Sequence, residues 1–386
     1  MTTVTGVPLS ILDLAPIPAG GTVRDALHNT INLARRAEAA GYRRYWLAEH
    51  HLAPGVASSA PQILIQAVAT ATTTLRVGSG AVQTGHWTPL AVAEQFGTIE
   101  ALHPGRIDLG LGRSGQRRNE PARHEPARHE PARHDAARES HEVNGLLIPK
   151  PFDSRVLANS PQVQAMKTLL QQPGAQTPDF ADQVDELAAL LDGTYRSPSG
   201  HRPAVVPGTG ADLELWILGS SGGQSAHVAG ERGLPFAANY HVAPAAVLEA
   251  VETYRAAFKP SAVLDEPYVM VSADVVVAPT DDEARHLASP YPLWVHSIRS
   301  ELAAIPYPTP EQAAAHQWTD EAWALVQDRV DTQLVGSPET VAERLDTLQW
   351  VTGADELLVT TITHDHTDRV RSFELLARHW RARRSG

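Results

Sequence analysis

The sequence predicts an α/β fold, a (β/α)8 TIM barrel with insertions, and two observations lead to this prediction. Short apolar runs alternate with amphipathic stretches along the 386-residue chain, a rhythm typical of parallel strands covered by helices. Eight such apolar runs can be counted, and eight parallel strands close this kind of barrel. A plain barrel needs about 250 residues, so we expect the remaining residues to lie in insertions.

The first half of the chain supplies four strands and the helices between them. Gly41 ends the first helix, because glycine is a common helix stop, and His103-Pro104-Gly105 ends the third. The expected strands cover residues 9–14, 42–51, 75–83 and 106–112, and the expected helices cover residues 25–40, 61–70 and 89–102.

The second half repeats the pattern, so we treat residues 1–386 as a single barrel domain. Insertions are expected at about 114–176, 193–211 and 288–320. The expected strands cover residues 213–219, 236–240, 268–278 and 356–363, and the expected helices cover residues 224–231, 245–257, 338–350 and 367–381, with another that begins at Asp281.

Composition narrows the class of protein. The chain has a formal net charge of −12, which argues against nucleic-acid binding, because that binding needs basic patches. It has no cysteine, which excludes disulfides, thiolate metal sites and cysteine nucleophiles. No apolar run is long enough to span a membrane, and the N-terminus lacks the layout of a secretory signal. We therefore expect a cytoplasmic enzyme that acts without a membrane.

A tandem repeat lies in the first expected insertion. The five residues Glu120-Pro-Ala-Arg-His124 recur at 125–129 and 130–134, and proline at every fifth position rules out a continuous helix. Histidine is a metal-ligand type, but the repeat has almost no apolar residue to bury, so we interpret it as an expansion in a solvent-exposed loop. No metal site is predicted. The histidines concerned are His124, His129, His134 and His141.

A glycine-rich segment follows the fourth expected strand. Residues 110–115 satisfy the spacing GxGxxG, but a dinucleotide site requires a helix to begin inside the motif, and here the proline-rich repeat follows. Arg113 stands at the carboxyl end of the strand, on the rim where barrel active sites lie. Its guanidinium suits a phosphate.

A glycine-serine turn joins the fifth expected strand to a helix. Glycines let the backbone approach a ligand, and the helix N-terminus offers unpaired N–H groups, so the turn suits a phosphate. Residues 219–223 also satisfy GxSxG, a hydrolase nucleophile elbow with Ser221, and Asp355 and His364 follow in the order of a catalytic triad. A plain tight turn is the third interpretation. The phosphate site is favoured, because four βα units precede the turn; its candidate residues are Ser220, Ser221, Gly222, Gly223 and Ser225.

Two other strand ends carry candidate residues. His50 and His51 end the second expected strand, and strand alternation points one into the barrel mouth and the other towards the helix layer. A lone strand-end histidine is also a common structural feature. The third strand ends in small residues, Gly78-Ser79-Gly80-Ala81, which leave room for a flat ring or allow close helix–strand packing.

Taken together, these segments resemble the bacterial luciferase-like flavin-dependent monooxygenases. The resemblance is in particular to the single-chain members of that family, which are classed as flavin-dependent oxidoreductases. No single motif is specific, but their order and spacing along eight βα units are. The segments are Trp46-Leu-Ala-Glu-His-His51, Gly78-Ser-Gly-Ala81, Pro89-Leu-Ala-Val-Ala-Glu-Gln-Phe-Gly97, Pro104-Gly-Arg-Ile-Asp-Leu-Gly-Leu-Gly-Arg113, Leu218-Gly-Ser-Ser221 with Gly233-Leu-Pro-Phe236, and Thr352-Gly-Ala-Asp-Glu356.

The resemblance implies roles for individual residues. His50 matches the family's active-site histidine beside the flavin, and Gly80–Ala81 matches a non-prolyl cis peptide under the flavin ring. Arg113 and the turn from Ser220 to Ser225 match the FMN phosphate site, and Glu94 matches a buried glutamate that we count with the cofactor residues. Gly112 stands where luciferase has a reactive cysteine, so light emission is not implied.

The resemblance also implies a reaction and partners. Reduced FMN would react with O2 to give a C4a-(hydro)peroxyflavin, which oxygenates a small organic substrate. Because the sequence has no credible nicotinamide-binding fingerprint, a separate NAD(P)H:FMN reductase is expected to supply the reduced flavin. Assembly into a homodimer is left open. A deazaflavin-dependent oxidoreductase on the same barrel and a hydrolase using Ser221 remain as alternatives.

Overall fold

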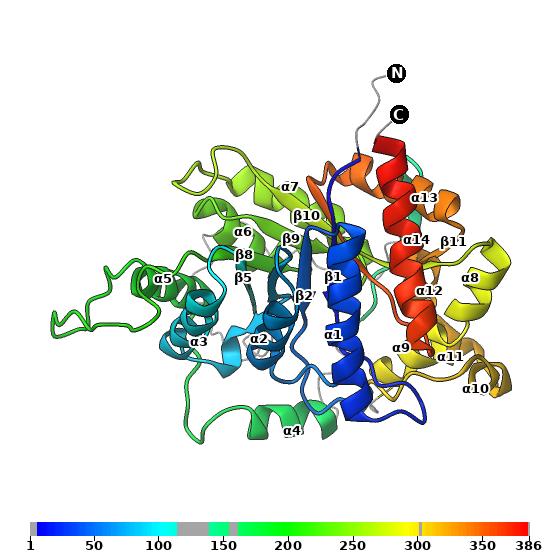
Figure 1. Cartoon of the computed structure of the whole chain (residues 1–386), viewed down its shortest axis with the longest axis horizontal. Helices are drawn as coiled ribbons and strands as arrows, with labels where there is room; N and C mark the ends of the chain where they lie inside the picture. The colour runs from blue at the N-terminus through cyan, green and yellow to red at the C-terminus, as the bar shows by residue number, and fades with distance from the viewer. Residues whose placement is uncertain (1–5, 114–138, 154–160, 301–302, 385–386) are drawn as a thin grey trace.

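A closed barrel of eight parallel strands forms the centre of the computed structural model, which describes residues 6–113, 139–153, 161–300 and 303–384 (Figure 1). Every neighbouring pair of barrel strands is parallel, and β10 closes the ring by pairing with both β9 and β12. The predicted (β/α)8 fold is therefore confirmed. The strands in order round the ring are β1 (Leu9–Asp13), β2 (Arg44–Leu47), β3 (Arg76–Ser79), β5 (Ile107–Gly112), β8 (Glu214–Gly219), β9 (Phe236–Asn239), β10 (Val269–Val277) and β12 (Glu356–Thr360).

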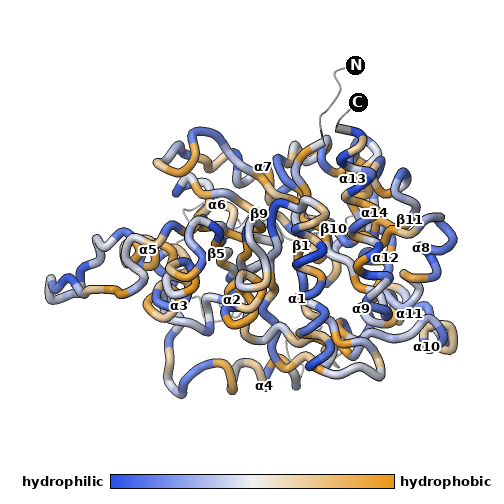
Figure 2. The backbone as a smooth tube through the Cα atoms, in the orientation of Figure 1, coloured by the Kyte–Doolittle hydropathy of each residue, from blue (hydrophilic) through white to orange (hydrophobic). Residues whose placement is uncertain are grey.

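Helices surround the barrel, and local sequence signals set their ends. Thr22 and Asp25 form a capping box at the start of α1, and Gly41 ends that helix at φ 79°, a conformation that glycine adopts readily. Hydrophobic and hydrophilic stretches alternate along α1, whereas the outer α8 is largely hydrophilic (Figure 2). The helices between barrel strands are α1 (Val23–Ala40), α2 (Pro61–Ala71), α3 (Pro89–Leu102), α5 (Phe180–Leu191), α6 (Gln224–Glu231), α7 (Val247–Ala257) and α13 (Pro338–Thr352), with α14 (His366–Arg384) after the last strand.

Two separate hydrophobic clusters follow from strand alternation. Outward-facing residues such as Val77 and Ile217 pack beneath the helices. Inward-facing residues fill the barrel, where Trp46 and Trp216 meet edge to face at 5.1 Å between ring centroids. Because the barrel interior is packed with these side chains, a ligand can bind only at an end of the barrel.

The amino-terminal end of the barrel is closed by a buried ionic network. Arg44 donates to Asp108 at 2.9 Å, to Glu214 at 2.6 Å and to Glu356 at 3.1 Å. Arg44, Asp108 and Glu356 are almost fully buried. One guanidinium thus connects β2 with β5, β8 and β12. In a TIM barrel this end serves stability, and the carboxyl end carries the active site.

Helices of the first and third insertions lie at the carboxyl ends of the strands, whereas the second insertion, 193–211, leads from α5 to the amino-terminal end of β8. Helices α4 and α9–α11 lie on the lower side of Figure 1, towards which the strands run. Main-chain bonds join this region, since Ile17 donates to Gly55 O at 2.8 Å and Gly55 donates to Ala304 O at 2.6 Å. The elements outside the barrel are β6 (His141–Val143), β7 (Leu146–Ile148), α4 (Pro161–Leu169), α8 (Asp281–Ala288), α9 (Tyr291–Arg299), α10 (Pro310–Ala315), α11 (Asp320–Ala324), α12 (Gln327–Thr332) and β11 (Leu334–Gly336).

Three segments differ from the expected pattern. The second strand ends at Leu47, short of the expected His51, so residues 48–51 belong to a loop. The third strand is interrupted at Gly80–Ala81 and continues as β4 (Val82–Gln83), which pairs with β5. The third insertion runs beyond residue 320, because α11 and α12 also precede β11.

The repeat at 120–134 lies outside the described residues. Within the described ranges, the helices are all too short or too polar to cross a membrane.

Candidate functional site

The candidate residues lie at the ends of four consecutive barrel strands. His50 follows β2, Ala81 follows β3, Arg113 follows β5 and the turn from Ser220 to Ser225 follows β8. Since all strands are parallel, these positions share the carboxyl rim. The structure therefore brings the predicted residues to one half of the barrel mouth.

His50 is a neutral, accessible histidine on this rim. Its backbone N–H donates to Ser58 O at 3.0 Å, which fixes the loop after β2. The residue has contact with solvent. The protein packed around its ring nevertheless disfavours the charged form and lowers the pKa of the imidazole to about 4, with a smaller contribution from His51. At neutral pH the imidazole is therefore uncharged, and one ring nitrogen offers a lone pair to a ligand.

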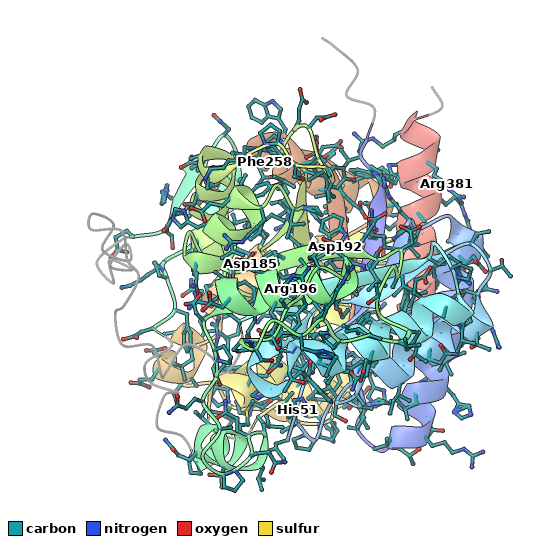
Figure 3. All side chains as sticks on the ribbon, turned by 90° about the vertical axis from the view of Figure 1, so that its left-hand side faces the viewer. His51, Asp185, Asp192, Arg196, Phe258 and Arg381 are labelled. Atoms are coloured by element: carbon teal, nitrogen blue, oxygen red, sulfur yellow. The ribbon has the colours of Figure 1, made fainter. Side chains whose placement is uncertain are left out.

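His51 has different surroundings. Its Nε2 lies 2.8 Å from Oε1 of the buried Glu49, and its ring meets that of His86 edge to face at 5.8 Å. Figure 3 places it on the same lower side of the molecule as α4. The two histidines differ in exposure, as expected. The cause is the loop that follows β2, because both residues lie beyond the strand end and strand alternation does not apply to them. His51 contacts the segment after β3 and not the helix layer that we expected.

Glu49 organises the rim between β2 and β3. It accepts from the Trp87 indole at 2.9 Å and from the Gln83 main-chain N–H at 2.8 Å, and its own carbonyl accepts from the Gln83 side chain at 2.5 Å. Glu49 is 3% exposed, so the bonds from Trp87 and the Gln83 main chain satisfy a buried carboxylate. Sequence reasoning included Glu49 only as part of a motif and did not predict this role.

Gly80 and Ala81 occupy the gap between β3 and β4. The peptide bond between them is cis, as the resemblance implied. A Cβ on Gly80 would lie 2.7 Å from Leu12 Cδ1 and 3.3 Å from Trp46 Cβ. The space beside Gly80 is therefore filled by core side chains, which favours the packing interpretation for this glycine.

Arg113 and the serine turn lie level with each other on neighbouring strands. In the β5–β8 register Leu111 is opposite Ile217, so Arg113 continues to the level of Gly219. Helix α6 begins after Gly223, which provides no side-chain cap. The N–H groups of Ala226 and His227 donate to Gly223 O, so those of Gln224 and Ser225, at the very start of α6, are the ones suited to an anion. Ser225 is buried, and Glu249 and Thr253 fill the space beside Gly222.

Glu94 requires a correction. The resemblance implied a buried glutamate, but Glu94 lies in α3 with an exposed side chain. The helix turns its Val92, Ala93 and Phe96 towards the barrel, and Glu94 falls on the opposite face. We therefore leave it out of the site.

The hydrolase interpretation is also wrong in its geometry. Ser221 and His364 follow the carboxyl ends of β8 and β12, whereas Asp355 precedes β12 and accepts from Val269 N–H at 2.8 Å. The five residues of β12 separate Asp355 from the rim, a distance of roughly 15 Å. His364 Nε2 instead contacts Ala19 O at 3.0 Å. No triad is assembled from these three residues.

The opposite half of the rim contains polar residues that sequence reasoning missed. His241 follows β9, and its Nδ1 lies 2.6 Å from Ser272 Oγ on β10. Further along β10, the buried Asp274 accepts from Arg329 at 3.2 Å and also from the Tyr291 hydroxyl. The missed signal was available, because Ser272 and Asp274 are polar residues at alternate positions of an otherwise apolar strand.

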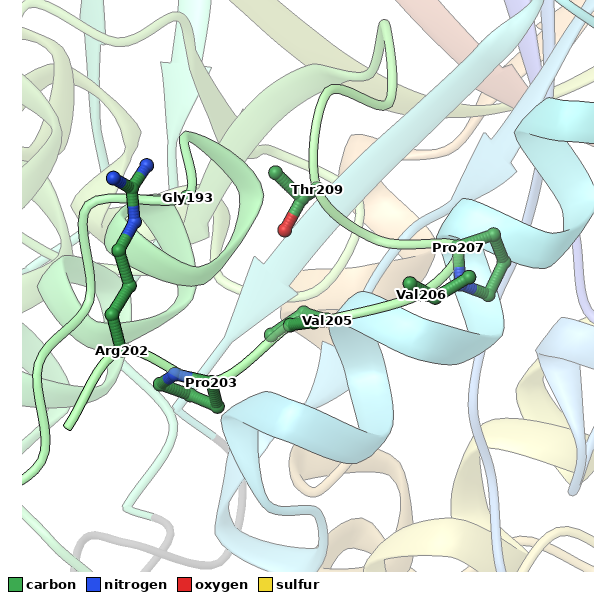
Figure 4. Close-up of a pocket in the computed structure, with 8 residues that line it drawn as sticks. Gly193, Arg202, Pro203, Val205, Val206, Pro207 and Thr209 are labelled. Atoms are coloured by element: carbon green, nitrogen blue, oxygen red, sulfur yellow. The ribbon is translucent and has the colours of Figure 1, made fainter.

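The described part of the chain also has an open cavity of about 350 Å³ away from the rim. A single loop between α5 and β8 forms its wall, with Arg202, Val205 and Thr209 around it (Figure 4). This loop leads to the amino-terminal end of β8, the end opposite the rim. Its side chains do not include any of the candidate residues. Within the described ranges, no group of three or more potential metal ligands occurs.

Comparison with known proteins finds relatives along nearly the whole chain. A sequence model of the luciferase-like monooxygenases matches residues 7–148 and 159–355. A luciferase-like monooxygenase from Escherichia coli K12 is 37% identical over 371 residues, which cover 96% of each chain. The crystal structure of apo-MsnO8 is similar with a TM-score of 0.76 and 32% identity over 98% of each chain. The oxygenating constituent of 3,6-diketocamphane monooxygenase from Pseudomonas putida, in complex with FMN, shares the fold with a TM-score of 0.63 and 20% identity over 98% of each chain.

Proposed function

Because the chain belongs to the luciferase-like monooxygenase family, we propose that it is a flavin-dependent monooxygenase that oxygenates a small organic substrate with reduced FMN and O2. The observation that carries the proposal is the order of residues round the rim. Arg113 with the Ser220–Ser225 turn, a small-residue segment and His50 occupy consecutive strand ends. This order fits a long, flat cofactor with a phosphate at one end.

The residues present fit FMN at three points. Arg113 and the N-terminal N–H groups of α6 would bind the phosphate through charge and hydrogen bonds. Leu12, Trp46 and Trp216 beneath the rim supply an apolar floor that excludes water. His50, on the far side of Ala81 from Arg113, would face the reacting atoms.

Bound reduced FMN would supply two electrons, so that one atom of O2 enters the substrate and the other leaves as water. His50 is uncharged at neutral pH, because its pKa is lowered to about 4. Its free ring nitrogen would accept a hydrogen bond or a proton from the substrate. We further propose that a separate NAD(P)H:FMN reductase supplies the reduced flavin.

A fluorescence titration with FMN and riboflavin tests the proposal. Riboflavin lacks the phosphate, so the wild-type protein should bind FMN at least ten-fold more tightly. Replacing Arg113 by Ala removes a charge-assisted bond worth about 1.5–3 kcal/mol, which weakens FMN ten-fold or more and leaves riboflavin unchanged.

Arg371→Ala serves as the control, because Arg371 is exposed on α14 and pairs with Glu283. Equal affinity for FMN and riboflavin would refute the phosphate site. A deazaflavin included in the same titration identifies the alternative cofactor if it binds more tightly than FMN.

A further inference from the structure

His241 and His50 come from opposite walls of the barrel. In the ring order β1-β2-β3-β5-β8-β9-β10-β12, four steps separate β2 from β9 in either direction. Both histidines lie just past the carboxyl ends of these strands. Two residues so placed face each other across the barrel axis.

Ser272 holds the His241 ring in place. It belongs to the inward-facing set of β10, since Met270 two residues earlier packs inside the barrel and Val271 packs outside. Ser272 Oγ lies 2.6 Å from His241 Nδ1 and 3.3 Å from Ala238 O. Ser272 is 2% exposed, so its hydroxyl is fixed by these bonds and cannot rotate freely into water.

With Nδ1 engaged, Nε2 is the ring atom of His241 that remains for a ligand. Like His50, His241 is only partly covered, although the surrounding protein lowers its pKa to about 3, with Arg329 and then His50 as further causes. His50 and His241 thus follow strands on opposite sides of the barrel mouth.

We propose that His241 is a second substrate-facing residue, which hydrogen-bonds the substrate opposite His50, and that Ser272 is its positioning residue. Substrates that fit carry a hydrogen-bonding group, because the Nε2 atom of His241 can donate or accept one hydrogen bond while Nδ1 is engaged by Ser272. This inference rests on the proposed function for the reaction, but the pairing of the two histidines does not depend on FMN.

NMR of the flavin-free protein with labelled histidine tests the pairing first. His241 should remain neutral down to about pH 4, and His50→Ala should shift its ring resonances. His28→Ala is the matched control, because His28 is exposed on α1, and it should leave His241 unchanged. Ser272→Ala should alter the balance of the two ring tautomers of His241, and Ser272→Thr, which keeps the hydroxyl, should restore it. If neither His50→Ala nor Ser272→Ala changes the ring resonances of His241, the proposal is overturned.

Turnover with FMN, a reductase and 4-(methylthio)benzyl alcohol as probe, which carries both a sulfide to oxygenate and a hydroxyl to hydrogen-bond, tests the role in oxygenation. His241→Phe keeps the ring volume, so FMN affinity should stay within three-fold of wild type. The sulfoxide formed per O2 should fall at least ten-fold, with hydrogen peroxide released instead, and His241→Gln should recover part of the loss. Unchanged coupling in His241→Phe would overturn the substrate-facing role. Failure of the wild-type protein to bind FMN would instead refute the proposed function. The NMR result would still decide the pairing of the two histidines, because it is obtained without flavin.

Discussion

At the scale of single residues, the two neighbouring histidines of the rim should have different effects. His50→Ala should keep FMN affinity within a few-fold, because the phosphate contacts lie two strands away. It should slow oxygen transfer by about 10²–10⁴, the usual range for a lost acid–base group. Consumed O2 should then appear as hydrogen peroxide.

His51→Ala should act on stability, because it leaves the buried Glu49 without one of its partners. We expect a loss of about 1–3 kcal/mol in the free energy of unfolding, with little change in coupling. Urea unfolding and a peroxide assay on both variants provide the comparison. If His51→Ala uncouples the reaction and His50→Ala does not, the catalytic role belongs to His51.

At the scale of elements, the carboxylate of Glu38 fastens the end of α1 to the start of β3. It accepts three main-chain N–H bonds, from Thr73 at 2.8 Å, Thr74 at 2.6 Å and Leu75 at 3.0 Å. Burial alone would raise its pKa, but these bonds lower it from 4.5 to about 2. Glu38→Ala should therefore cost about 1–3 kcal/mol of stability at pH 7.

The pH dependence of this contribution has a definite sign. A carboxylate whose pKa is lowered on folding stabilises the protein fully above its unfolded pKa, here 4.5, and loses the effect as the pH falls towards about 2. The difference in unfolding free energy between wild type and Glu38→Ala should thus be constant above pH 5 and shrink below it. A difference that grows as the pH falls would contradict this.

The sequence predicted the elements well where periodicity and stop signals were clear, as for α1 between Thr22 and Gly41. It failed where a strand end depends on partners that lie far away in the chain. The apolar run before His50 continues past Leu47, and only the positions of Ser58 and Gln83 show that the chain has left the sheet there. Ser272 and Asp274 visibly interrupt the apolar pattern of β10, but their partners could not be predicted, because these come from α9, α12 and the loop after β9. The Ser220–Ser225 turn was predicted from local glycine and helix signals alone.

At the scale of the whole molecule, stability and the proposed chemistry occupy opposite ends of the barrel. Arg44→Leu would remove the guanidinium that pairs with both buried carboxylates, Asp108 and Glu356, which should cost about 3–5 kcal/mol. Because the change lies far from the rim, FMN affinity of the folded fraction should be unchanged.

Arg36→Ala is the control for this effect. Arg36 pairs with Glu374 at 2.5 Å across α1 and α14, but its side chain is 54% exposed, so its loss should cost less than about 1 kcal/mol. Urea unfolding midpoints of the two variants measure the contrast. Equal midpoints would show that the network does not hold the barrel end closed.

The ring order of the strands has a further consequence for how the site is assembled. Strands β1, β2, β3 and β5 all precede residue 113, and β8, β9, β10 and β12 all follow residue 213. Arg113 and His50 belong to the first set, whereas the serine turn and His241 belong to the second. A chain cut between α5 and β8 would thus separate Arg113 from the serine turn and His50 from His241. Oxygenation would then require both fragments and would report their reassociation.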